Sequence, residues 1–252
     1  MPVRTLLNLV SRAKPAPLSI PPDRRIYAIG DIHGRLDLLD RLLAMIDEDD
    51  SRRRRVQTEL IFLGDLVDRG PQSSGVVERL MAVARQRATR FLMGNHEEVF
   101  LRALEGDLKA LRFLIRIGGR ETLLSYGISE EDYRNLDYDE LMAAFRAAVP
   151  RAHIAFLAGF EHWIEAGDYL FVHAGIRPGV ALEAQKPADL RWIRDDFLRC
   201  RTSFGKIVVH GHSITDEIDE RGNRIGIDTG AFASGKLTAI GLEGDERWYL
   251  ST

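Results

Sequence analysis

Five short clusters of acidic, amide and histidine residues recur along this 252-residue sequence, each after an apolar run, and they hold five of its seven histidines. The clusters are GDIHG at residues 30–34, GDLVDRG at 64–70, GNHE at 94–97, VHAG at 172–175 and HGH at 210–212. Carboxylate, imidazole and amide oxygen atoms are the ligands that hard and borderline divalent metals prefer. The clusters therefore predict a metal centre.

The shared position of the clusters is stronger evidence than any one of them. A single Asp-x-His or Asn-His pair is usually a polar turn, and a lone strand histidine is more often hydrogen-bonded core than a ligand. In open α/β sheets, however, ligands bind beyond the carboxyl ends of the strands, where all five clusters would lie. His153 and His162 lie outside the clusters, and we expect them to be structural.

The residues between the clusters predict strands and helices that alternate. Apolar β-type runs at residues 26–29, 60–63 and 90–93 each end at a glycine, and helical patterns at residues 36–46 and 75–84 separate them. A strand–helix–strand unit that repeats after about 30 residues is typical of parallel β-α-β architecture. The sequence therefore predicts an α/β fold that brings the clusters to one sheet edge.

The middle and the beginning of the chain have different patterns. From about residue 97 to residue 165, apolar residues between Leu108 and Ile115 recur at helical spacing, which predicts a helical insertion. β-type runs return at residues 169–172, 206–209, 223–227 and 236–242. Pro15, Pro17, Pro21 and Pro22 disfavour regular structure near the beginning, so we expect an N-terminal tail over residues 1–25 and one domain over residues 26–252.

Composition limits the classes of function. The chain has 45% hydrophobic and 29% charged residues and a net charge of -3. A chain of negative net charge is not attracted as a whole to nucleic acid or to an anionic membrane. No apolar run approaches the roughly 20 residues of a membrane span. The single cysteine, Cys200, excludes an intramolecular disulfide framework and suits a reducing compartment. We expect a cytoplasmic protein that binds neither nucleic acid nor membrane.

The ordered set GDIHG, GDLVDRG, GNHE, VHAG and GH resembles the calcineurin-like metallophosphoesterase superfamily. GDLVDRG and GNHE are similar to its phosphoprotein phosphatase branch, and the resemblance spans about residues 26–240. HAGIRP at residues 173–178 and LRWIR at 190–194 are similar to bacterial members related to the phage lambda phosphatase. The resemblance implies a two-sheet α/β/β/α sandwich with the metals at the sheet edge.

The resemblance also implies two divalent metal ions, with Mn²⁺ as the expected metal and Fe or Zn as alternatives. Carried over by position, the ligands are Asp31, His33 and Asp65 for the first metal, and Asp65, Asn95, His173 and His212 for the second. Asp65 bridges because a carboxylate has two oxygens. The family pattern places the last ligand after the glycine, so His210 stays a neighbouring residue that could support the site.

Four further residues complete the site that the resemblance implies. His96 would protonate the leaving alkoxide, and Asp68 would orient its imidazole. Arg69 and Arg194 would bind the phosphoryl oxygens. A hydroxide bound by both metals would attack phosphorus directly, without a phosphoenzyme. The role of Arg194 stays open because the neighbouring Arg191 departs from the hydrophobic residue usual there.

These motifs predict a metal-dependent phosphomonoester hydrolase, and within that class a serine/threonine protein phosphatase acting on phosphoproteins or small phosphoesters. The alternative is a symmetric bis(5'-nucleosyl)-tetraphosphatase, which shares most motifs. The insertion contains several cations, with Phe113 and Tyr126 nearby, so a nucleotide site is not excluded. The spacing of these cations among acidic residues nevertheless favours a solvated helix face. We therefore expect higher kcat/KM for phosphoserine peptides than for diadenosine tetraphosphate.

Other classes fit the sequence less well. A phosphodiesterase or nuclease is disfavoured because Ile214 replaces the last histidine of a G-H-x-H pattern, and an inactive scaffold because every expected ligand position is filled. Residues 230–236 nearly match a nucleotide-binding P-loop, but Leu237 replaces its Ser/Thr. A cysteine phosphatase would need an arginine six residues after Cys200, where Lys206 stands.

Overall fold

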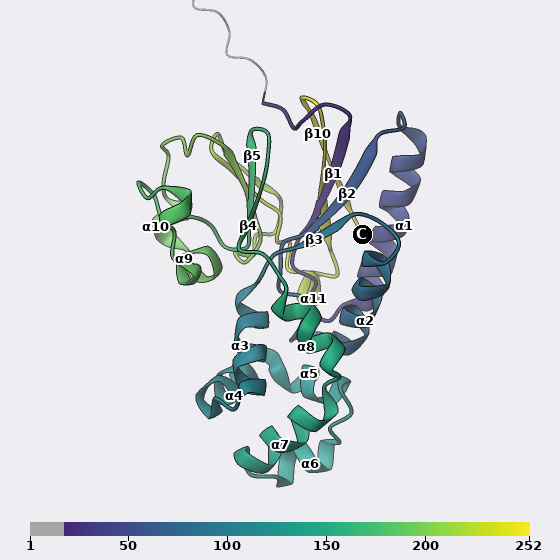
Figure 1. Ribbon diagram of the computed structural model, residues 1–252, viewed down its shortest axis with the longest axis vertical. Coiled ribbons are helices and arrows are strands. Elements are labelled where there is room, and N and C mark those ends of the chain that lie inside the picture. Colours follow the sequence, from purple (N-terminus) through teal and green to yellow (C-terminus); the bar gives the residue numbers. More distant parts are fainter. Residues whose placement is uncertain (1–17) are drawn as a thin grey trace, which may run out of the picture.

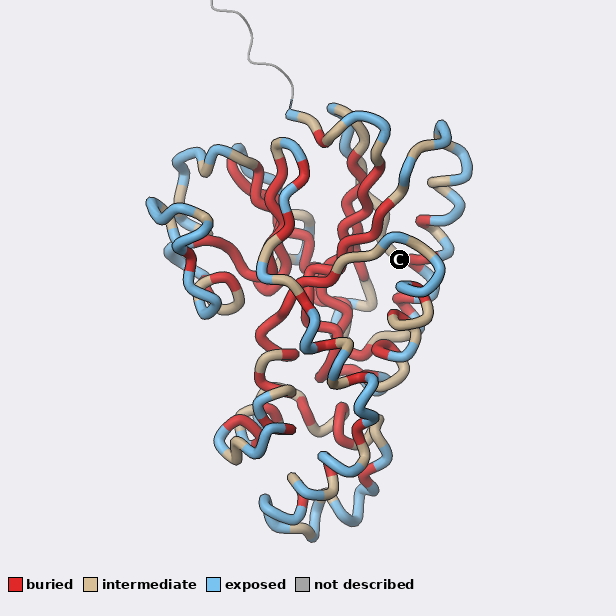
Figure 2. The backbone as a smooth tube through the Cα atoms, viewed as in Figure 1, coloured by how far each residue is buried: buried red, intermediate tan, exposed pale blue. Residues whose placement is uncertain are grey.

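Two five-stranded β-sheets are stacked face to face, with helices on both outer sides, in the computed structural model of this protein, which describes residues 18–252 (Figure 1). Figure 2 shows that the buried backbone runs along the strands and through the region where the two sheets meet. The two-sheet sandwich predicted from the sequence is confirmed.

The first sheet contains the glycine-bounded apolar runs. Its strands, in the order β10-β9-β1-β2-β3, are β1 (Arg24–Ile29), β2 (Gln57–Phe62), β3 (Thr89–Phe91), β9 (Thr238–Glu243) and β10 (Glu246–Ser251). β1, β2 and β3 are parallel, whereas β9 pairs antiparallel with both β1 and β10. Tyr27 and Ile29 pack under helices α1 (Leu36–Arg52) and α2 (Ser73–Ala84), and Ile26 faces the second sheet. The alternation along a strand thus supplies two cores.

The second sheet has the strand order β4-β5-β6-β8-β7. Its strands are β4 (Trp163–Ala166), β5 (Tyr169–Val172), β6 (Ile207–His210), β7 (Asp219–Glu220) and β8 (Arg224–Gly226). β5, β6 and β8 are parallel to one another. Helices α9 (Pro187–Trp192) and α10 (Asp195–Leu198) cover its outer face through Leu190 and Phe197.

The predicted helical insertion projects below the sheets in Figure 1. It comprises α3 (Asn95–Glu105), α4 (Leu108–Leu114), a π-turn (Ile115–Gly119), α5 (Arg120–Ser125), α6 (Glu130–Asn135), α7 (Tyr138–Ala148) and α8 (Arg151–Ala158). Asp107, Ser129 and Asp137 cap α4, α6 and α7 with their side-chain oxygens. Among the described residues no single helix is long and apolar enough to cross a bilayer, and α7 and α8 reach that length only as a pair bent by 90°.

Most predicted boundaries are shifted by one to three residues, and the end of α1 and the N-terminal segment differ further. Helix α1 continues past residue 46 to Arg52, where i,i+4 ion pairs such as Arg53–Asp49 support its last turns. Residues 1–17 of the predicted tail lie outside the described residues. Of the rest of that segment, Ile20 is buried and its N–H donates to Gly244 O, and β1 already begins at Arg24.

The end of α1 is tied to the far edge of the first sheet by one carboxylate. Asp49 Oδ2 accepts hydrogen bonds from Tyr27 Oη (2.6 Å), Trp248 Nε1 (2.9 Å) and Arg53 Nε (2.9 Å). Burial raises the pKa of Asp49, but these hydrogen bonds outweigh it and hold the pKa below the ordinary value of 3.8. The ionised form of Asp49 therefore stabilises the fold.

Candidate metal centre

The loops that follow the central strands of both sheets meet at one edge. After β1 and β2, the N–H of His33 donates to Asp65 O (2.9 Å). After β5 and β6, the N–H of Gly211 donates to His173 O (2.9 Å), and the N–H of His212 reaches across to Asp31 Oδ2 (3.0 Å). Backbone hydrogen bonds therefore fix the clusters relative to one another before any ligand binds.

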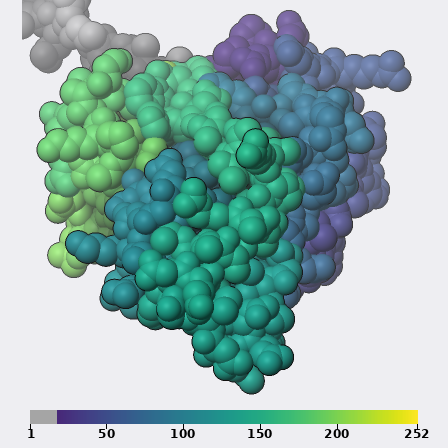
Figure 3. All heavy atoms as spheres, turned by 60° about the horizontal axis from the view of Figure 1, so that its bottom comes forward, coloured from purple at the N-terminus to yellow at the C-terminus, as the bar shows by residue number. Residues whose placement is uncertain are grey.

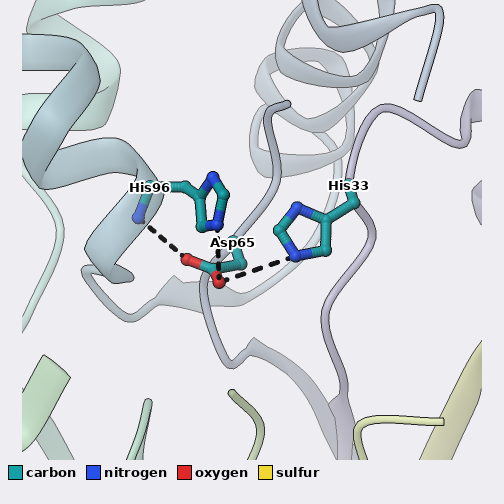
Figure 4. Close-up of side chains that lie close together, drawn as sticks. All are labelled: His33, Asp65 and His96. Atoms are coloured by element: carbon teal, nitrogen blue, oxygen red, sulfur yellow. Dashed lines mark hydrogen bonds and ion pairs between the residues drawn. The ribbon is translucent and has the colours of Figure 1, made fainter. Parts of the chain in front are cut away.

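Asp65 lies at the centre of the site. Figure 4 shows His33 and His96 on either side of its carboxylate, with His33 Nε2 3.6 Å and His96 Nε2 3.9 Å from Asp65 Oδ2. These three residues form one group that could hold a metal ion, with ligand atoms within 4.8 Å of one another. The same carboxylate takes part in a second group, so its position fits the predicted bridge.

The second group contains Asp65, His173 and His212. His173 Nε2 lies 3.4 Å from Asp65 Oδ1 and 3.0 Å from Asn95 Oδ1. His212 Nδ1 lies 2.8 Å from the same Asn95 oxygen. The structure thus brings together all four residues that the sequence predicted for the second metal.

Asp31 differs from this pattern, because the first group contains His96 in its place. Its carboxylate is nevertheless buried at the same edge, and a Cβ on Gly211 would lie 2.0 Å from Asp31 Oδ1. Asp31 Oδ1 has no hydrogen-bond partner among the described residues. Burial raises the pKa of Asp31 well above 3.8, and the charges of Asp228 and Asp65 raise it further.

The histidine nitrogens fit divalent cations. His33 Nδ1 donates to Val67 O (2.8 Å), and His173 Nδ1 donates to Leu63 O (2.8 Å). A neutral imidazole that donates through Nδ1 presents a free lone pair at Nε2, which is the usual arrangement of a metal ligand. His33 Nε2 is buried with no partner in the described part of the chain, and burial lowers the pKa of His33 well below 6.5. Likewise, burial lowers the pKa of His212 to about 2.

His96 is coupled to Asp68, as the sequence predicted. His96 Nδ1 lies 2.6 Å from Asp68 Oδ2, and both side chains are buried. Burial lowers the pKa of His96, but the charges of Asp65 and Asp68 outweigh it and raise the pKa above 6.5. The two carboxylates therefore favour the protonated imidazole, which is the form that an acid needs.

Thr122, from helix α5 of the insertion, supports Asp68 from behind. Its hydroxyl donates to Asp68 Oδ1 (2.6 Å) and accepts from the N–H of Asp68 (2.9 Å). Ser73 Oγ completes this buried network, 2.9 Å from Thr122 Oγ1. Helix α5 is thereby linked, through Asp68, to His96, the predicted proton donor.

Arg69 points into the site. Its Nη2 lies 3.2 Å from His96 Nε2, and its guanidinium lies 4.8 Å from the centroid of the Phe232 ring. The backbone of Gly118 holds it, because Gly118 O accepts from the N–H of Arg69 and a Cβ on Gly118 would lie 2.7 Å from Arg69 Cγ. Arg194 is exposed in the turn before α10, and its charge lowers the pKa of His212.

The backbone at the site is unusual. Six non-glycine residues among those described have positive φ between 47° and 71°, and five of them are predicted site residues: His33, Asp65, Asp68, Arg69 and His212. Such left-handed conformations are sparsely populated by residues with a Cβ and cluster at functional sites.

Glu97, the last residue of GNHE, organises the loop that carries Asp65. Its carboxylate accepts hydrogen bonds from the N–H groups of Asp65 (2.8 Å), Leu66 (2.7 Å) and Gly94 (3.1 Å). Gly94 is required there because a Cβ would lie 2.3 Å from Asp65 Oδ1. Burial and the charge of Asp65 raise the pKa of Glu97 to about 7.

The remaining candidates take structural places. His210 packs edge-on against Phe197 and its Nδ1 lies 3.0 Å from Gly211 O, so it is outside both metal groups. His153 lies between Tyr126 Oη and Glu78 Oε2, each at 3.0 Å, and His162 is exposed.

The sequence did not single out Thr122, Phe232, Trp192 or Asp228. Phe232 lies in the segment that resembles a P-loop, and Trp192 lies in LRWIR. These two motifs are the sequence signals that could have pointed to both residues. Asp228 is buried, with Oδ2 lacking a partner within residues 18–252.

Known proteins are similar to this chain in sequence. The chain is 26% identical over 235 residues to the asymmetrical bis(5'-nucleosyl)-tetraphosphatase PrpE of Anoxybacillus flavithermus, covering 84% of this chain and 88% of that one. It is 34% identical over 153 residues to the symmetrical bis(5'-nucleosyl)-tetraphosphatase of Acidovorax sp. (strain JS42), covering 61% of this chain. The chain spans less than half (44%) of that relative's length.

Solved structures share the fold at low identity. A cold-active protein tyrosine phosphatase superposes with a TM-score of 0.52 at 20% identity, covering 92% of this chain and 81% of that one. A metallophosphoesterase from Sphaerobacter thermophilus gives 0.52 at 15% identity, covering 90% and 87%. The pattern of the calcineurin-like phosphoesterase family matches residues 24–235. Together with the metal-ligand groups at the sheet edge, this match shows that the chain belongs to the calcineurin-like phosphoesterase family.

Proposed function

We propose that this metallophosphoesterase hydrolyses dinucleoside polyphosphates, with bis(5'-nucleosyl) tetraphosphates as the first candidates. The sequence motifs favoured a serine/threonine protein phosphatase, with this activity as the alternative. The relatives support the alternative better, because both the asymmetrical and the symmetrical relatives bear tetraphosphatase names.

The observation that carries the proposal is a pair of aromatic rings at the two ends of the centre. The ring centroid of Phe232 lies 5.6 Å from that of His33, in the first metal group. The ring centroid of Trp192 lies 6.4 Å from that of His212, in the second group. A dinucleoside polyphosphate carries one base at each end of its phosphate chain, and bases stack on aromatic rings. A phosphoserine side chain has no group that would use either ring.

The predicted ligand residues provide carboxylate, imidazole and amide donors, which suit Mn²⁺, Fe or Zn. Two such cations would activate water and neutralise the charge that develops on the phosphoryl oxygens. Side chains of this protein bind the substrate and supply the proton. Arg69 binds a phosphoryl oxygen beside His96, and Arg194 approaches from the His212 side. His96, with its proton fixed by Asp68, protonates the leaving oxygen.

A substrate panel tests the proposal. Protein reconstituted in parallel with Mn²⁺, Fe²⁺ and Zn²⁺ is assayed with diadenosine tetraphosphate, a phosphoserine peptide and p-nitrophenyl phosphate. We expect kcat/KM for diadenosine tetraphosphate to exceed that for the peptide by at least about tenfold, which is about 1.4 kcal/mol of additional transition-state binding. Chromatography of the products separates symmetric cleavage to two ADP from asymmetric cleavage to ATP and AMP. A preference for the peptide would restore the protein phosphatase prediction.

A further inference from the structure

Resting on the proposed function, we propose that the insertion and helix α9 form a subsite for the second nucleotide of a dinucleoside polyphosphate, the half that is not attacked. This distal subsite consists of Trp192, Phe113, Lys109, Arg112 and Arg116. The two aromatic rings would stack on the base, and the three cations would bind phosphates of the substrate chain.

A row of ring contacts connects the distal subsite to the metal centre. Trp192 packs edge-on toward the ring of His212, at 6.4 Å between centroids. The ring centroid of Phe113, on α4, lies 5.8 Å from that of Trp192. The guanidinium of Arg116 lies 4.8 Å from the centroid of Phe113. A single ligand can therefore touch the second metal group at one end and the insertion at the other.

Trp192 is held in place by the helix that carries the catalytic residues. Its Nε1 donates to Glu98 Oε2 (2.9 Å), and Glu98 lies on α3 close to Asn95 and His96. The neighbouring Arg191 contacts the other oxygen of Glu98 (3.2 Å). A ring fixed by a hydrogen bond on rigid elements loses little conformational entropy on binding, as a stacking platform requires.

A pocket of about 410 Å³ opens beside Phe113, and Lys109, Arg112, Phe113 and Arg116 line it. This volume is in the range of small-ligand sites, roughly 300–1,000 Å³. Figure 3 shows this face of the molecule, with the helices of the insertion turned forward beside the green segment that carries α9.

The charges of the pocket distinguish a ligand site from a solvated helix face. Arg102 pairs with Asp107, and Arg120 pairs with Glu121 and Glu130, so these two cations are neutralised. For Lys109, Arg112 and Arg116, no carboxylate within residues 18–252 lies within the 4 Å of an ion pair. The guanidinium of Arg116 lies over the Phe113 ring and that of Arg112 over the Tyr138 ring (4.7 Å), and both cations line the pocket with Lys109. Three cations without an ion-pair partner in the described residues, beside an aromatic ring, match a polyphosphate joined to a base.

Packing of the insertion against α9 is the competing explanation for the Phe113–Trp192 contact. Packing requires the two rings, but it does not require unpaired cations around an open pocket. Substitutions that keep the shape of the side chains therefore separate the two explanations.

The test uses the full-length, metal-loaded protein with two variants and one matched control. Arg116→Gln removes an exposed charge, and Phe113→Leu keeps an apolar contact while it removes the stacking ring. Arg102→Gln removes an ion-paired charge from the same insertion. For each protein, kcat/KM is measured with diadenosine tetraphosphate and with p-nitrophenyl phosphate, and binding of a methylene-bridged, non-hydrolysable diadenosine tetraphosphate is measured by calorimetry.

We expect each variant to lower the ratio of the two kcat/KM values about tenfold, and to weaken binding of the analogue by a similar factor. The ratio cancels indirect effects through Arg69, which serves both substrates. Arg102→Gln should change neither the ratio nor the binding. Thermal unfolding verifies that Phe113→Leu is folded.

The outcomes separate this inference from the function on which it rests. If wild-type protein prefers the phosphopeptide, the proposed function fails and the distal subsite fails with it. If wild-type protein prefers diadenosine tetraphosphate but both variants keep the wild-type ratio and affinity, the proposed function stands and the distal subsite is wrong.

Discussion

Replacing Thr122 by valine tests whether the insertion supports the proton donor. Valine has nearly the same shape as threonine, but it removes the buried hydroxyl that donates to Asp68 Oδ1 and accepts from the N–H of Asp68. The N–H retains Ser73 Oγ at 3.0 Å, so the main loss is the hydrogen bond to the carboxylate. A hydrogen bond to a charged group contributes about 1.5–3 kcal/mol, and with the neutral bonds the expected loss of unfolding free energy is about 2–4 kcal/mol.

Activity should fall together with stability. Asp68 then holds His96 less firmly, and loss of such a supporting hydrogen bond typically costs about 10- to 100-fold in activity. The loss should be larger for alkyl phosphates, whose leaving groups need a proton, than for p-nitrophenyl phosphate.

Urea unfolding and a leaving-group series measure the two effects, with Thr122→Ser as the matched control. Serine keeps the hydroxyl and removes only a methyl group, so the control should lose about 1 kcal/mol and little activity. Equal loss of activity in Thr122→Ser and Thr122→Val, or an unchanged leaving-group dependence, would refute the reasoning.

Three further predictions concern metals, proton transfer and pH. Chelated protein should be inactive and recover with Mn²⁺, and Asp65→Asn should lose metal from both positions in elemental analysis; full metal content would contradict the bridging role. His96→Asn should keep its metal and lose about 10²–10⁴ in kcat for poor leaving groups, whereas equal losses for all leaving groups would point to positioning. Because the pKa of Asp49 is depressed in the folded state, its contribution is present above the unfolded pKa and is lost as pH falls through the folded one. Unfolding free energy should therefore decrease between about pH 5 and pH 2 less steeply in Asp49→Asn, as urea titrations would show; an unchanged slope would contradict this.

The sequence predicted the sheet edge well because its signals are local. An apolar run that ends at a glycine predicts a strand. An aspartate, asparagine or histidine just after that glycine then lies at the carboxyl end of the strand, where a metal ligand is expected. The same logic explains why β1, β2 and β5 were found and why β4 and β10 were not. β4 has four residues at a sheet edge, and β10 carries Glu246 and Arg247 at its start, so neither has a strong apolar run.

The supporting contacts could not be predicted, because they join distant segments. Thr122 meets Asp68 across 54 residues of sequence, and no motif surrounds it. Trp192 meets Glu98 across 94 residues. From the sequence, the cations of the insertion were predicted to form a solvated helix face. The structure shows that Arg102 and Arg120 form ion pairs, whereas Lys109, Arg112 and Arg116 have no ion-pair partner within residues 18–252.

The left-handed backbone at the site has a consequence for how this protein would respond to selection. Each left-handed residue with a Cβ costs of order 1–3 kcal/mol, and the surrounding hydrogen bonds offset that cost. At Arg69 (φ 68°), glycine would adopt the same conformation without strain, but it would lose the guanidinium beside His96. A population selected for thermal stability alone would therefore drift toward glycine or asparagine at such positions and lose activity as it became more robust. Activity and stability oppose each other in this loop at the level of single dihedral angles.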